Sequence, residues 1–174
     1  MNMKAKFYRC PICGNVIVKL VDSGVTPTCC GREMELLHEN STEGKTEYHI
    51  PVIEEIDDCT VNIRVGQEMH PHSKEHHIEF ILLTTCDKYG NVGMMVKGLQ
   101  AEQKPELTFH VPMKAILSIY AYCNIHGLWV KHLKECDTNS PDAKQKQDAE
   151  QCGTYPAFCG ECPKDPSEAY YSCD

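Results

Sequence analysis

The chain has 174 residues, 12 of them cysteine, and its 17 Lys and Arg against 25 Asp and Glu give a net charge of -8. This length fits one or two compact domains, and an acidic chain lacks the basic face that sequence-tolerant nucleic-acid binding needs. The longest apolar runs, such as 78–83, are far shorter than the roughly 20 residues that span a bilayer, and residues 1–7 lack the apolar core of a signal peptide. We therefore expect a cytoplasmic protein without nucleic-acid or membrane partners, in which cysteines serve as thiols or metal ligands rather than disulfides.

The first zone, residues 1–37, is too small for a self-sufficient hydrophobic core, so we expect a metal to stabilise it. It holds Cys10, Cys13, Cys29 and Cys30. A Cys-x-x-Cys turn lets two sulfurs face one ion, and two such pairs make a tetrahedral site for Zn or Fe. Cys29 and Cys30 are adjacent rather than spaced, so Pro27 and Gly31 must bend the chain there. A structural zinc knuckle is the alternative that the spacing leaves open, and a disulfide pair is disfavoured.

Residues 38–45 are polar, which predicts a linker. The second zone, 46–133, alternates apolar and polar residues as half-buried strands do. The alternation is found at 60–65, 77–82 and 107–111. Residues 87–91 read as a turn between two such runs. Several short strands at this spacing predict an antiparallel sandwich of the immunoglobulin-like kind. The stretch 114–122 fits either a strand or a buried helix.

The third zone, 134–174, is a cysteine-rich tail that begins with a helix-start signal at Ser140-Pro141 and continues into a short solvated helix over 143–151. Its four cysteines are Cys152, Cys159, Cys162 and Cys173. Four thiols are enough for a third metal site or an iron–sulfur cluster, although this spacing matches no cluster motif. Two disulfides, or free thiols, are the alternatives. Three further cysteines are expected to be ordinary thiols: Cys59, Cys86 and Cys136.

Histidines gather in the strand-rich zone and precede one isolated cysteine. They are His49, His70, His72, His76 and His77, followed downstream by Cys123 and His126. Several imidazoles with one thiolate suit a redox metal, because imidazole binds Fe, Zn, Cu and Ni and the thiolate donates electron density. The stretch from His72 to His76 also matches the zinc-protease pattern H-x-x-E-H. That motif needs a helix, which Pro71 and a strand beginning near Ile78 disfavour.

Five motifs in one order resemble the two-iron superoxide reductases, the desulfoferrodoxins. They are Cys-x-x-Cys, Cys-Cys, Glu-x-His-x-Pro-Val-Ile-Glu, His-Pro with a further His six residues on, and Cys-Asn-Ile-His-Gly-Leu-Trp. The resemblance covers about residues 4–133 and implies a mainly β chain: a small desulforedoxin-like module and an immunoglobulin-like antiparallel sandwich, with the tail outside it. It also implies one-electron reduction of superoxide to hydrogen peroxide, a small donor such as rubredoxin, a homodimer and an anaerobic host.

The resemblance implies two iron sites. Cys10, Cys13, Cys29 and Cys30 match the FeS4 centre, in which an adjacent cysteine pair is a family trait. His49, His70, His76 and His126 match the equatorial ligands of the catalytic iron, and Cys123 matches its axial thiolate. Glu47 matches the carboxylate that caps the sixth position, whereas His72 and His77 fall at no ligand position. The backbone N–H groups of Asn124 and Ile125 are expected to bond to the Cys123 sulfur.

Position 48 departs from the family, which usually has a lysine there to attract superoxide, whereas this chain has Tyr48. A phenol carries no positive charge at neutral pH, and the acidic chain repels an anion. We therefore expect a slower and less salt-sensitive encounter, with Lys74 or Lys45 as substitutes. The rival interpretation is a non-catalytic electron-transfer or redox-sensing iron protein, and a zinc-only structural protein is a weaker third.

Overall fold

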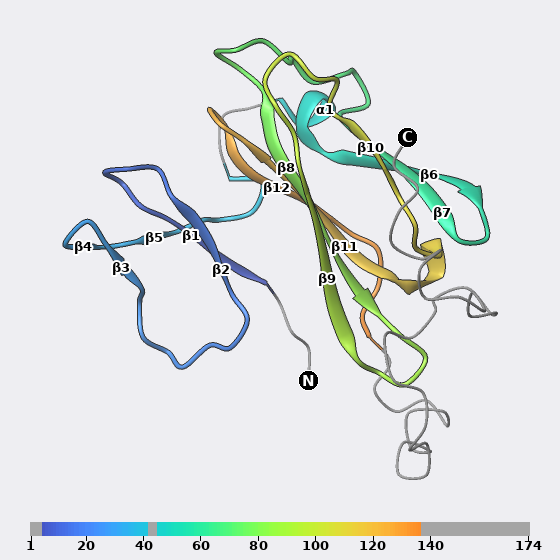
Figure 1. The fold of residues 1–174 in the computed structure, drawn as a ribbon, viewed down its shortest axis with the longest axis horizontal. Helices are drawn as coiled ribbons and strands as arrows, with labels where there is room; N and C mark the ends of the chain where they lie inside the picture. Colours follow the sequence, from blue (N-terminus) through green and yellow to red (C-terminus); the bar gives the residue numbers. More distant parts are fainter. Residues whose placement is uncertain (1–4, 42–44, 137–174) are drawn as a thin grey trace, which may run out of the picture.

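The computed structural model describes residues 5–41 and 45–136, in which strands dominate (Figure 1). The N-terminal module consists of short strands: β1 (Lys6–Arg9), β2 (Val16–Lys19), β3 (Thr28–Cys29), β4 (Arg32–Glu33) and β5 (Glu35–Leu36). Strands β2, β1 and β5 form one antiparallel sheet, and β3 pairs with β4. These strands bury little apolar surface of their own, as expected of a module that a metal stabilises.

Two antiparallel sheets make up the second part of the chain. The first has the order β10 (Glu106–Phe109), β7 (Thr60–Val65), β6 (Pro51–Asp57), and the second has the order β12 (Gly127–His132), β11 (Ile116–Cys123), β8 (Ile78–Cys86), β9 (Val92–Gly98). The short helix α1 (Thr46–His49) precedes β6, and a 3-10 turn, η1 (Met113–Ala115), precedes β11. The predicted immunoglobulin-like sandwich is confirmed, and its core contains the inward-facing Val61, Ile63 and Val65 of β7.

Strand β11 is buried along its whole length, and the helix that 114–122 also allowed is wrong. Ile119 and Ala121 face the sandwich core, whereas Tyr120 and Tyr122 face the opposite side of the sheet. Both faces of β11 are therefore covered, which is why its sequence lacks the alternation of a half-buried strand.

The N-terminal module supplies the cover on the outer face of the four-stranded sheet. The Phe7 ring lies 5.1 Å from the Tyr120 ring and 6.2 Å from the Phe80 ring, measured between centroids. Val16 and Val18 of β2 pack against the same cluster. The two parts of the chain thus share a second hydrophobic core in addition to the core within the sandwich.

Residues 39 and 40 of the expected linker contact strand β12. The Asn40 backbone N–H donates to the Leu128 carbonyl at 3.0 Å, and its side-chain oxygen accepts from the Val130 N–H at 2.8 Å. One position earlier, Glu39 lies 3.1 Å from the His132 ring nitrogen. This segment extends the edge of β12 and fixes how the chain passes from the module to the sandwich.

The structure corrects the expectation that Cys59, Cys86 and Cys136 are ordinary thiols. Cys86 and Cys136 form a disulfide with their Cα atoms 5.6 Å apart, and Cys59 is also disulfide-bonded. The fold brings the end of β8 next to the segment after β12, although 50 residues separate the two cysteines in sequence. The tail cysteines Cys152, Cys159, Cys162 and Cys173, and the helix expected over 143–151, lie outside the described residues.

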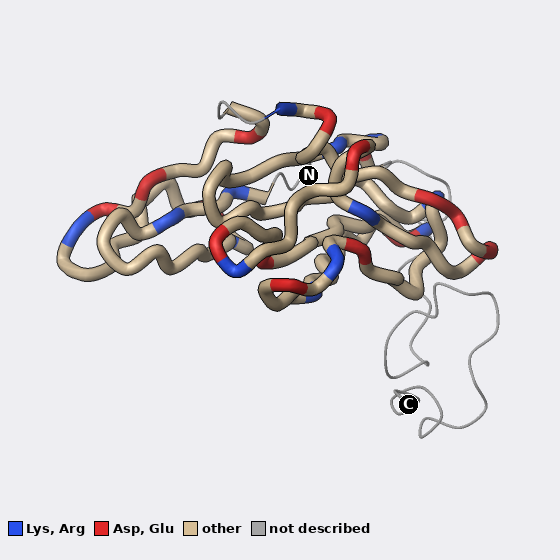
Figure 2. Tube along the Cα trace, turned by 90° about the horizontal axis from the view of Figure 1, so that it is seen from above, with Lys and Arg blue, Asp and Glu red and all other residues tan. Residues whose placement is uncertain are grey.

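Acidic and basic residues are interspersed along the described trace, with no single basic face (Figure 2). Among the described residues, no helix has the length and apolar character needed to cross a membrane.

Candidate metal centres

Five side chains from three parts of the chain meet at one end of the sandwich: His49, His70, His76, Cys123 and His126. Their ligand atoms all lie within 4.8 Å of one another. His49 ends α1, His70 and His76 lie in the loop between β7 and β8, and Cys123 and His126 lie at the turn between β11 and β12. The structure therefore brings together all five residues that the sequence predicts for the second iron site, and it leaves His72 out of the group.

Hydrogen bonds on the far sides of the rings decide which nitrogens face the centre. His49 Nδ1 lies 2.8 Å from the Lys45 carbonyl oxygen, and His70 Nδ1 lies 2.6 Å from that of Pro71, so Nε2 of each ring points inward. His126 instead presents Nδ1, which lies 2.9 Å from His49 Nε2 and 3.7 Å from Cys123 Sγ. Such second contacts commonly fix the tautomer of a metal-binding histidine.

Unpartnered buried nitrogens fit a metal at this centre. Nε2 of His70 and Nε2 of His76 are buried and find no hydrogen-bond partner in the described part of the chain. Buried polar atoms are almost always paired, so two orphaned nitrogens that face a thiol and two more imidazoles indicate metal ligands. His77 Nδ1 is also orphaned, but His77 does not belong to the ligand group.

The Cys123 thiol is completely buried, and this burial raises its pKa. The backbone N–H groups of His126, 3.4 Å from the sulfur, and of Ile125 oppose the shift and favour the thiolate. The expectation that the Asn124 N–H also bonds to the sulfur is wrong, because it donates to the His77 carbonyl. The Asn124 side chain accepts from the His77 N–H and donates to the Glu75 carbonyl, which ties the loop carrying His76 to the end of β11.

Three of the ligand histidines, His49, His70 and His76, have their pKa values lowered by their surroundings. Burial lowers the pKa of His70 to about 4, and it also lowers the pKa values of His49 and His76. The neighbouring imidazoles lower them further, since a charge on one ring disfavours a charge on the next. Neutral rings keep a lone pair available for a metal near pH 7.

Two residues that support the histidine–cysteine centre were not predicted from the sequence. The Trp129 indole stacks on the His49 ring and donates from Nε1 to the His126 carbonyl at 3.1 Å. Gly66 has φ +86°, and a Cβ there would lie 2.1 Å from the Glu68 carbonyl oxygen and 2.6 Å from that of Tyr48. The Trp stands in the Cys-Asn-Ile-His-Gly-Leu-Trp motif, but nothing in the sequence marks what its ring contacts.

The second group lies in the N-terminal module, where the sulfurs of Cys10, Cys13, Cys29 and Cys30 all come within 4.8 Å of one another. The adjacent cysteines are possible because the chain bends sharply, with φ +51° at Cys30 and +75° at Gly31. The sequence predicts this bend at Pro27 and Gly31, and the structure shows that Cys30 also adopts a positive φ there. The Cys13 sulfur lies 3.6 Å from the Cys29 sulfur, so the four thiols form one cluster.

The pKa values of Cys10 and Cys30 in this cluster are shifted in opposite directions. The Cys13 backbone N–H lowers the pKa of Cys10 to about 6, whereas hydrogen bonds from Cys13 and Cys29 raise the pKa of Cys30 to about 12. One thiolate is thus preferred in the metal-free cluster. A metal bound by four thiolates must displace the remaining protons, so its affinity rises with pH.

Fold and ligand groups together define a two-centre metalloprotein built on an immunoglobulin-like sandwich. The sequence matches the family described as desulfoferrodoxin over residues 41–132 and its N-terminal domain over residues 3–37. The chain belongs to the desulfoferrodoxin family, and the two ligand groups are its two iron sites.

Relatives and a solved structure agree with this assignment. Desulfoferrodoxin of Syntrophotalea carbinolica is 35% identical over 74% of this chain and 97% of its own length. Superoxide reductase of Pyrococcus horikoshii is 36% identical over 51% of this chain and 88% of its own length. The crystal structure of superoxide reductase from Treponema pallidum aligns with a TM-score of 0.59 and 25% identity, covering 74% of this chain and 99% of that one.

Proposed function

We propose that this protein is a superoxide reductase, which reduces superoxide to hydrogen peroxide at the histidine–cysteine centre. The observation that carries the proposal is the ligand set itself, in which four imidazoles and one buried thiolate converge from three parts of the chain. Iron held there supplies a ferrous–ferric couple that can pass one electron to superoxide. The relatives and solved structures named superoxide reductase support this activity.

The chain's own residues prepare the centre in two ways. Burial lowers the pKa values of His49, His70 and His76 and so favours their uncharged form, which limits the charge of the centre. The Cys123 thiolate, supported by the His126 N–H, donates electron density from the buried side. Glu47 lies exposed on α1, two residues before His49, and we assign it the carboxylate that would bind the metal when no substrate is bound. Tyr48 lies between them and is assigned to the entrance, where its phenol can donate a hydrogen bond.

Further parts of the proposal concern organisation and partners. A module over 1–37, a linker over 38–45, a catalytic sandwich over 46–133 and a tail over 134–174 are the proposed divisions. The proposed location is the cytoplasm, because the five ligand cysteines must stay reduced to bind metal; the Cys86–Cys136 disulfide is the feature of the structure that this location does not explain. A rubredoxin-like carrier is the proposed electron donor, and a third metal at Cys152, Cys159, Cys162 and Cys173 is the proposed role of the tail.

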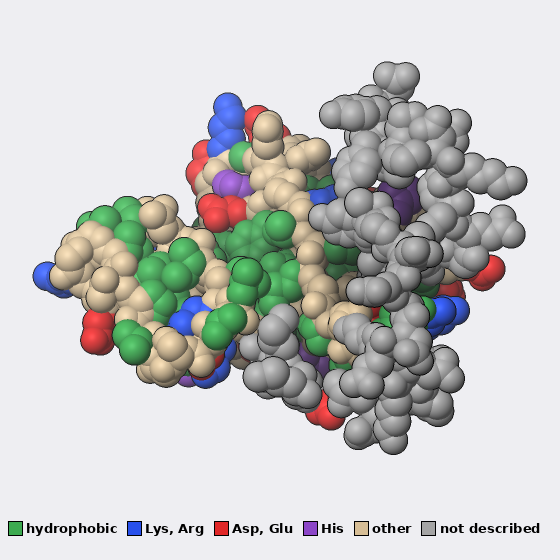
Figure 3. Space-filling view, turned by 60° about the horizontal axis from the view of Figure 1, so that its bottom comes forward, with side chains coloured by type: hydrophobic (Ala, Val, Ile, Leu, Met, Phe, Trp, Pro, Cys, Tyr) green, Lys and Arg blue, Asp and Glu red, His purple; other side chains and the backbone are tan. Residues whose placement is uncertain are grey.

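A homodimer is proposed through the N-terminal module. Large apolar side chains gather on its surface (Figure 3). They include Leu20, Val21 and Val25, of which 62%, 83% and 69% are exposed. Exposed apolar patches of this kind commonly mark interaction surfaces. Sedimentation of the full chain would test the dimer, and a monomer at micromolar concentration would refute it.

The alternative function is a non-catalytic redox sensor, which the extra disulfide-bonded cysteines favour. Anaerobic purification with iron, zinc and sulfide counted per chain, followed by repeated superoxide additions to the reduced protein with a reductant present, separates the two. A reductase yields peroxide without oxygen at every addition, whereas a sensor reacts once. A colourless, zinc-only preparation would contradict both.

A further inference from the structure

We propose that Cys86 and Cys136 form a redox-active dithiol pair, which hydrogen peroxide closes to the disulfide seen in the structure and which a thiol reductant reopens. This inference rests on the proposed function, because the reduction of superoxide supplies the peroxide. It gives the chain a second, thiol-based reaction, which takes place away from both metal centres and consumes the product of the first.

The described cysteines are in two oxidation states. Cys86 and Cys136 are bonded to each other and Cys59 is also disulfide-bonded, whereas the five ligand cysteines are free thiols. Metal ligands must be thiolates, and the reducing compartment that we propose keeps ordinary thiols reduced. A disulfide in such a chain therefore needs an oxidant that the protein meets more often than its neighbours do. Peroxide released by the protein itself meets this requirement.

The fold holds the two cysteines together through contacts that do not depend on their bond. Cys86 ends β8, which pairs with both β9 and β11. The Leu133 and Lys134 backbone N–H groups donate to the Leu117 carbonyl of β11 at 2.8 and 3.3 Å. These hydrogen bonds hold the segment that leads to Cys136 against the same sheet, and the Cα atoms of the two cysteines lie 5.6 Å apart. Each thiol of the open pair thus keeps its partner within reach.

The turn after Cys86 has a hydrogen-bond network of its own. The Asp87 carboxylate accepts from the backbone N–H groups of Tyr89 and Asn91 at 2.9 and 2.8 Å and from the Asn91 side chain at 2.6 Å. The Asp87 N–H donates to the Asn91 carbonyl at 3.0 Å. Cys86 and Cys136 are both half-buried, so a small oxidant can reach them. The bond therefore opens and closes by movement of the Cys136 segment, while the turn keeps its shape.

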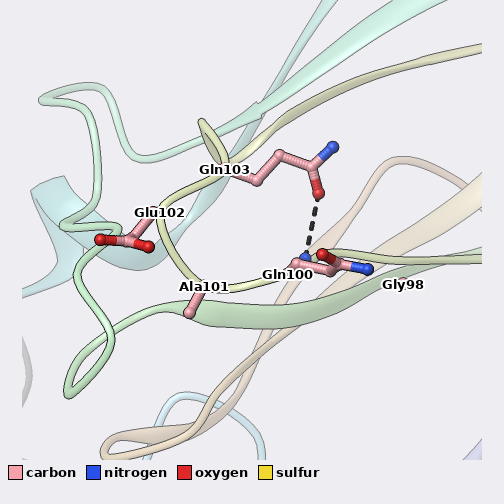
Figure 4. Close-up of a pocket in the computed structure, with 5 residues that line it drawn as sticks. All are labelled: Gly98, Gln100, Ala101, Glu102 and Gln103. Atoms are coloured by element: carbon pink, nitrogen blue, oxygen red, sulfur yellow. Dashed lines mark hydrogen bonds between the residues drawn. The ribbon is translucent and has the colours of Figure 1, made fainter.

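The pair lies at the opposite end of the β8–β9 hairpin from the histidine–cysteine centre. His76 precedes β8, whose nine residues (Ile78–Cys86) span roughly 27 Å at about 3.3 Å per residue. Figure 4 shows the metal-centre end of the hairpin, where Glu102 lies in the turn that follows Gly98 at the end of β9. The Glu102 carboxylate lies 4.0 Å from Nζ of Lys74, in the loop before β8. Peroxide must leave the metal centre before it meets the pair, so the pair responds to released peroxide.

The reaction balances with peroxide as its oxidant. A thiolate of the pair attacks one peroxide oxygen and breaks the O–O bond, which gives a sulfenic acid, and the other oxygen leaves as water. The second thiol then attacks the sulfenic sulfur, forms the S–S bond and releases the remaining oxygen as water. Two thiols and one peroxide give one disulfide and two waters. Two thiols of a reductant reopen the bond by exchange and become a disulfide themselves.

The experiment counts this bond before and after exposure to peroxide. The iron-loaded full chain is equilibrated anaerobically with glutathione at the cytosolic poise, freed of glutathione and treated with a small excess of hydrogen peroxide. Free thiols are then alkylated, and the peptides are mapped by mass. The pair should be open after glutathione and closed after peroxide, with unchanged iron content. A pair that stays bonded in glutathione, or stays open in peroxide, would overturn the inference.

Single variants test whether the two thiols act together. In Cys86→Ser the remaining Cys136 has no partner, so peroxide should carry it to sulfinic and sulfonic acids, which thiol reductants do not reverse. Cys136→Ser should show the same loss at Cys86. Cys59→Ser is the matched control, because it makes the same exchange at the turn between β6 and β7 and should close the pair as the parent does. Equal recovery of the Cys136 thiol in Cys86→Ser and the parent would contradict a joint reaction.

Added peroxide keeps this test independent of the proposed function, because it bypasses superoxide reduction. The double variant Cys86→Ser/Cys136→Ser serves the converse purpose, since it lacks the pair and should reduce superoxide at the parent rate. Loss of superoxide reduction in the parent would refute the proposed function while the peroxide titration still reports on the pair. Normal superoxide reduction with a pair that peroxide does not close would refute the dithiol reaction alone.

Discussion

The Trp129 indole lies against the His49 imidazole, with ring centroids 4.5 Å apart and planes 24° apart. The same indole donates to the His126 carbonyl, so one side chain from β12 supports two metal-binding histidines that are 77 residues apart. Groups that orient metal ligands contribute strongly to metal affinity.

Trp129→Leu should therefore lower iron affinity at the histidine centre by about 10-fold to 100-fold. Trp129→Phe keeps a ring against His49 but removes the N–H donor, so its loss should be smaller. Iron competition with a chelator measures both variants, and the FeS4 absorption serves as an internal control in the same sample. Equal iron affinity in Trp129→Leu and the parent would show that the stacking has no supporting role.

Gly66 is expected to tolerate no side chain, because its φ of +86° and the nearby carbonyls of Glu68 and Tyr48 exclude a Cβ. Gly66→Ala should lower the free energy of unfolding by about 2–4 kcal/mol and displace α1 with His49. Gly24→Ala is the matched control, since Gly24 has a similar φ of +82° but nothing within 4 Å of its Cβ position. It should cost only about 1–2 kcal/mol. Urea unfolding measures both variants. An equal loss in the free energy of unfolding for Gly66→Ala and Gly24→Ala would contradict this account.

The Cys86–Cys136 disulfide closes a long loop and should stabilise the sandwich. Cys86→Ser is expected to lower the free energy of unfolding by about 2–4 kcal/mol under oxidising conditions. Cys136→Ser and the double variant should show the same loss, because each removes the same bond. The measurement is thermal unfolding with and without a thiol reductant. Iron counts at both centres should be unchanged, and a double variant much less stable than either single one would argue against the bond.

The iron-free protein should become less stable as the pH falls below 6.5. The unfolded chain binds protons at its histidines near pH 6.5, whereas burial lowers the pKa of His70 to about 4 and also lowers those of His49 and His76. Protons then favour the unfolded state, and stability is lost progressively between about pH 6.5 and pH 4. Melting curves from pH 7 to pH 4.5 test this. His70→Gln should reduce the slope, whereas His72→Gln, outside the ligand group, should leave it unchanged.

The four cysteines of the N-terminal site were predictable from their spacing, whereas the choice of His49, His70, His76, His126 and Cys123 for the second site came from the resemblance to a known family. Cys10 and Cys13 form a local turn, and Cys123 and His126 flank another, so each pair is visible without knowing the fold. The strands with one solvent-facing side, such as β7, were predictable from their alternation. Strand β11 was ambiguous because the module covers its second face, and that packing links positions far apart in the chain.

The disulfide, the Trp129 stack and the Gly66 contact depend on tertiary approach and leave no local pattern. Cys86 and Cys136 meet because β8 and β12 belong to the same four-stranded sheet, so that the end of β8 lies near the segment after β12.

The burial of β11 on both faces has a consequence for the dynamics of the Cys123 thiolate. Every residue of this strand is buried, and its backbone is paired with β8 on one side and β12 on the other. Amide hydrogen exchange along β11 should therefore require the largest opening of the protein, close to global unfolding. Cys123 stands at the end of this slowest-exchanging segment, so the thiolate of the ligand group is anchored to the part of the molecule that fluctuates least. Local opening is left to the loops that carry the imidazoles.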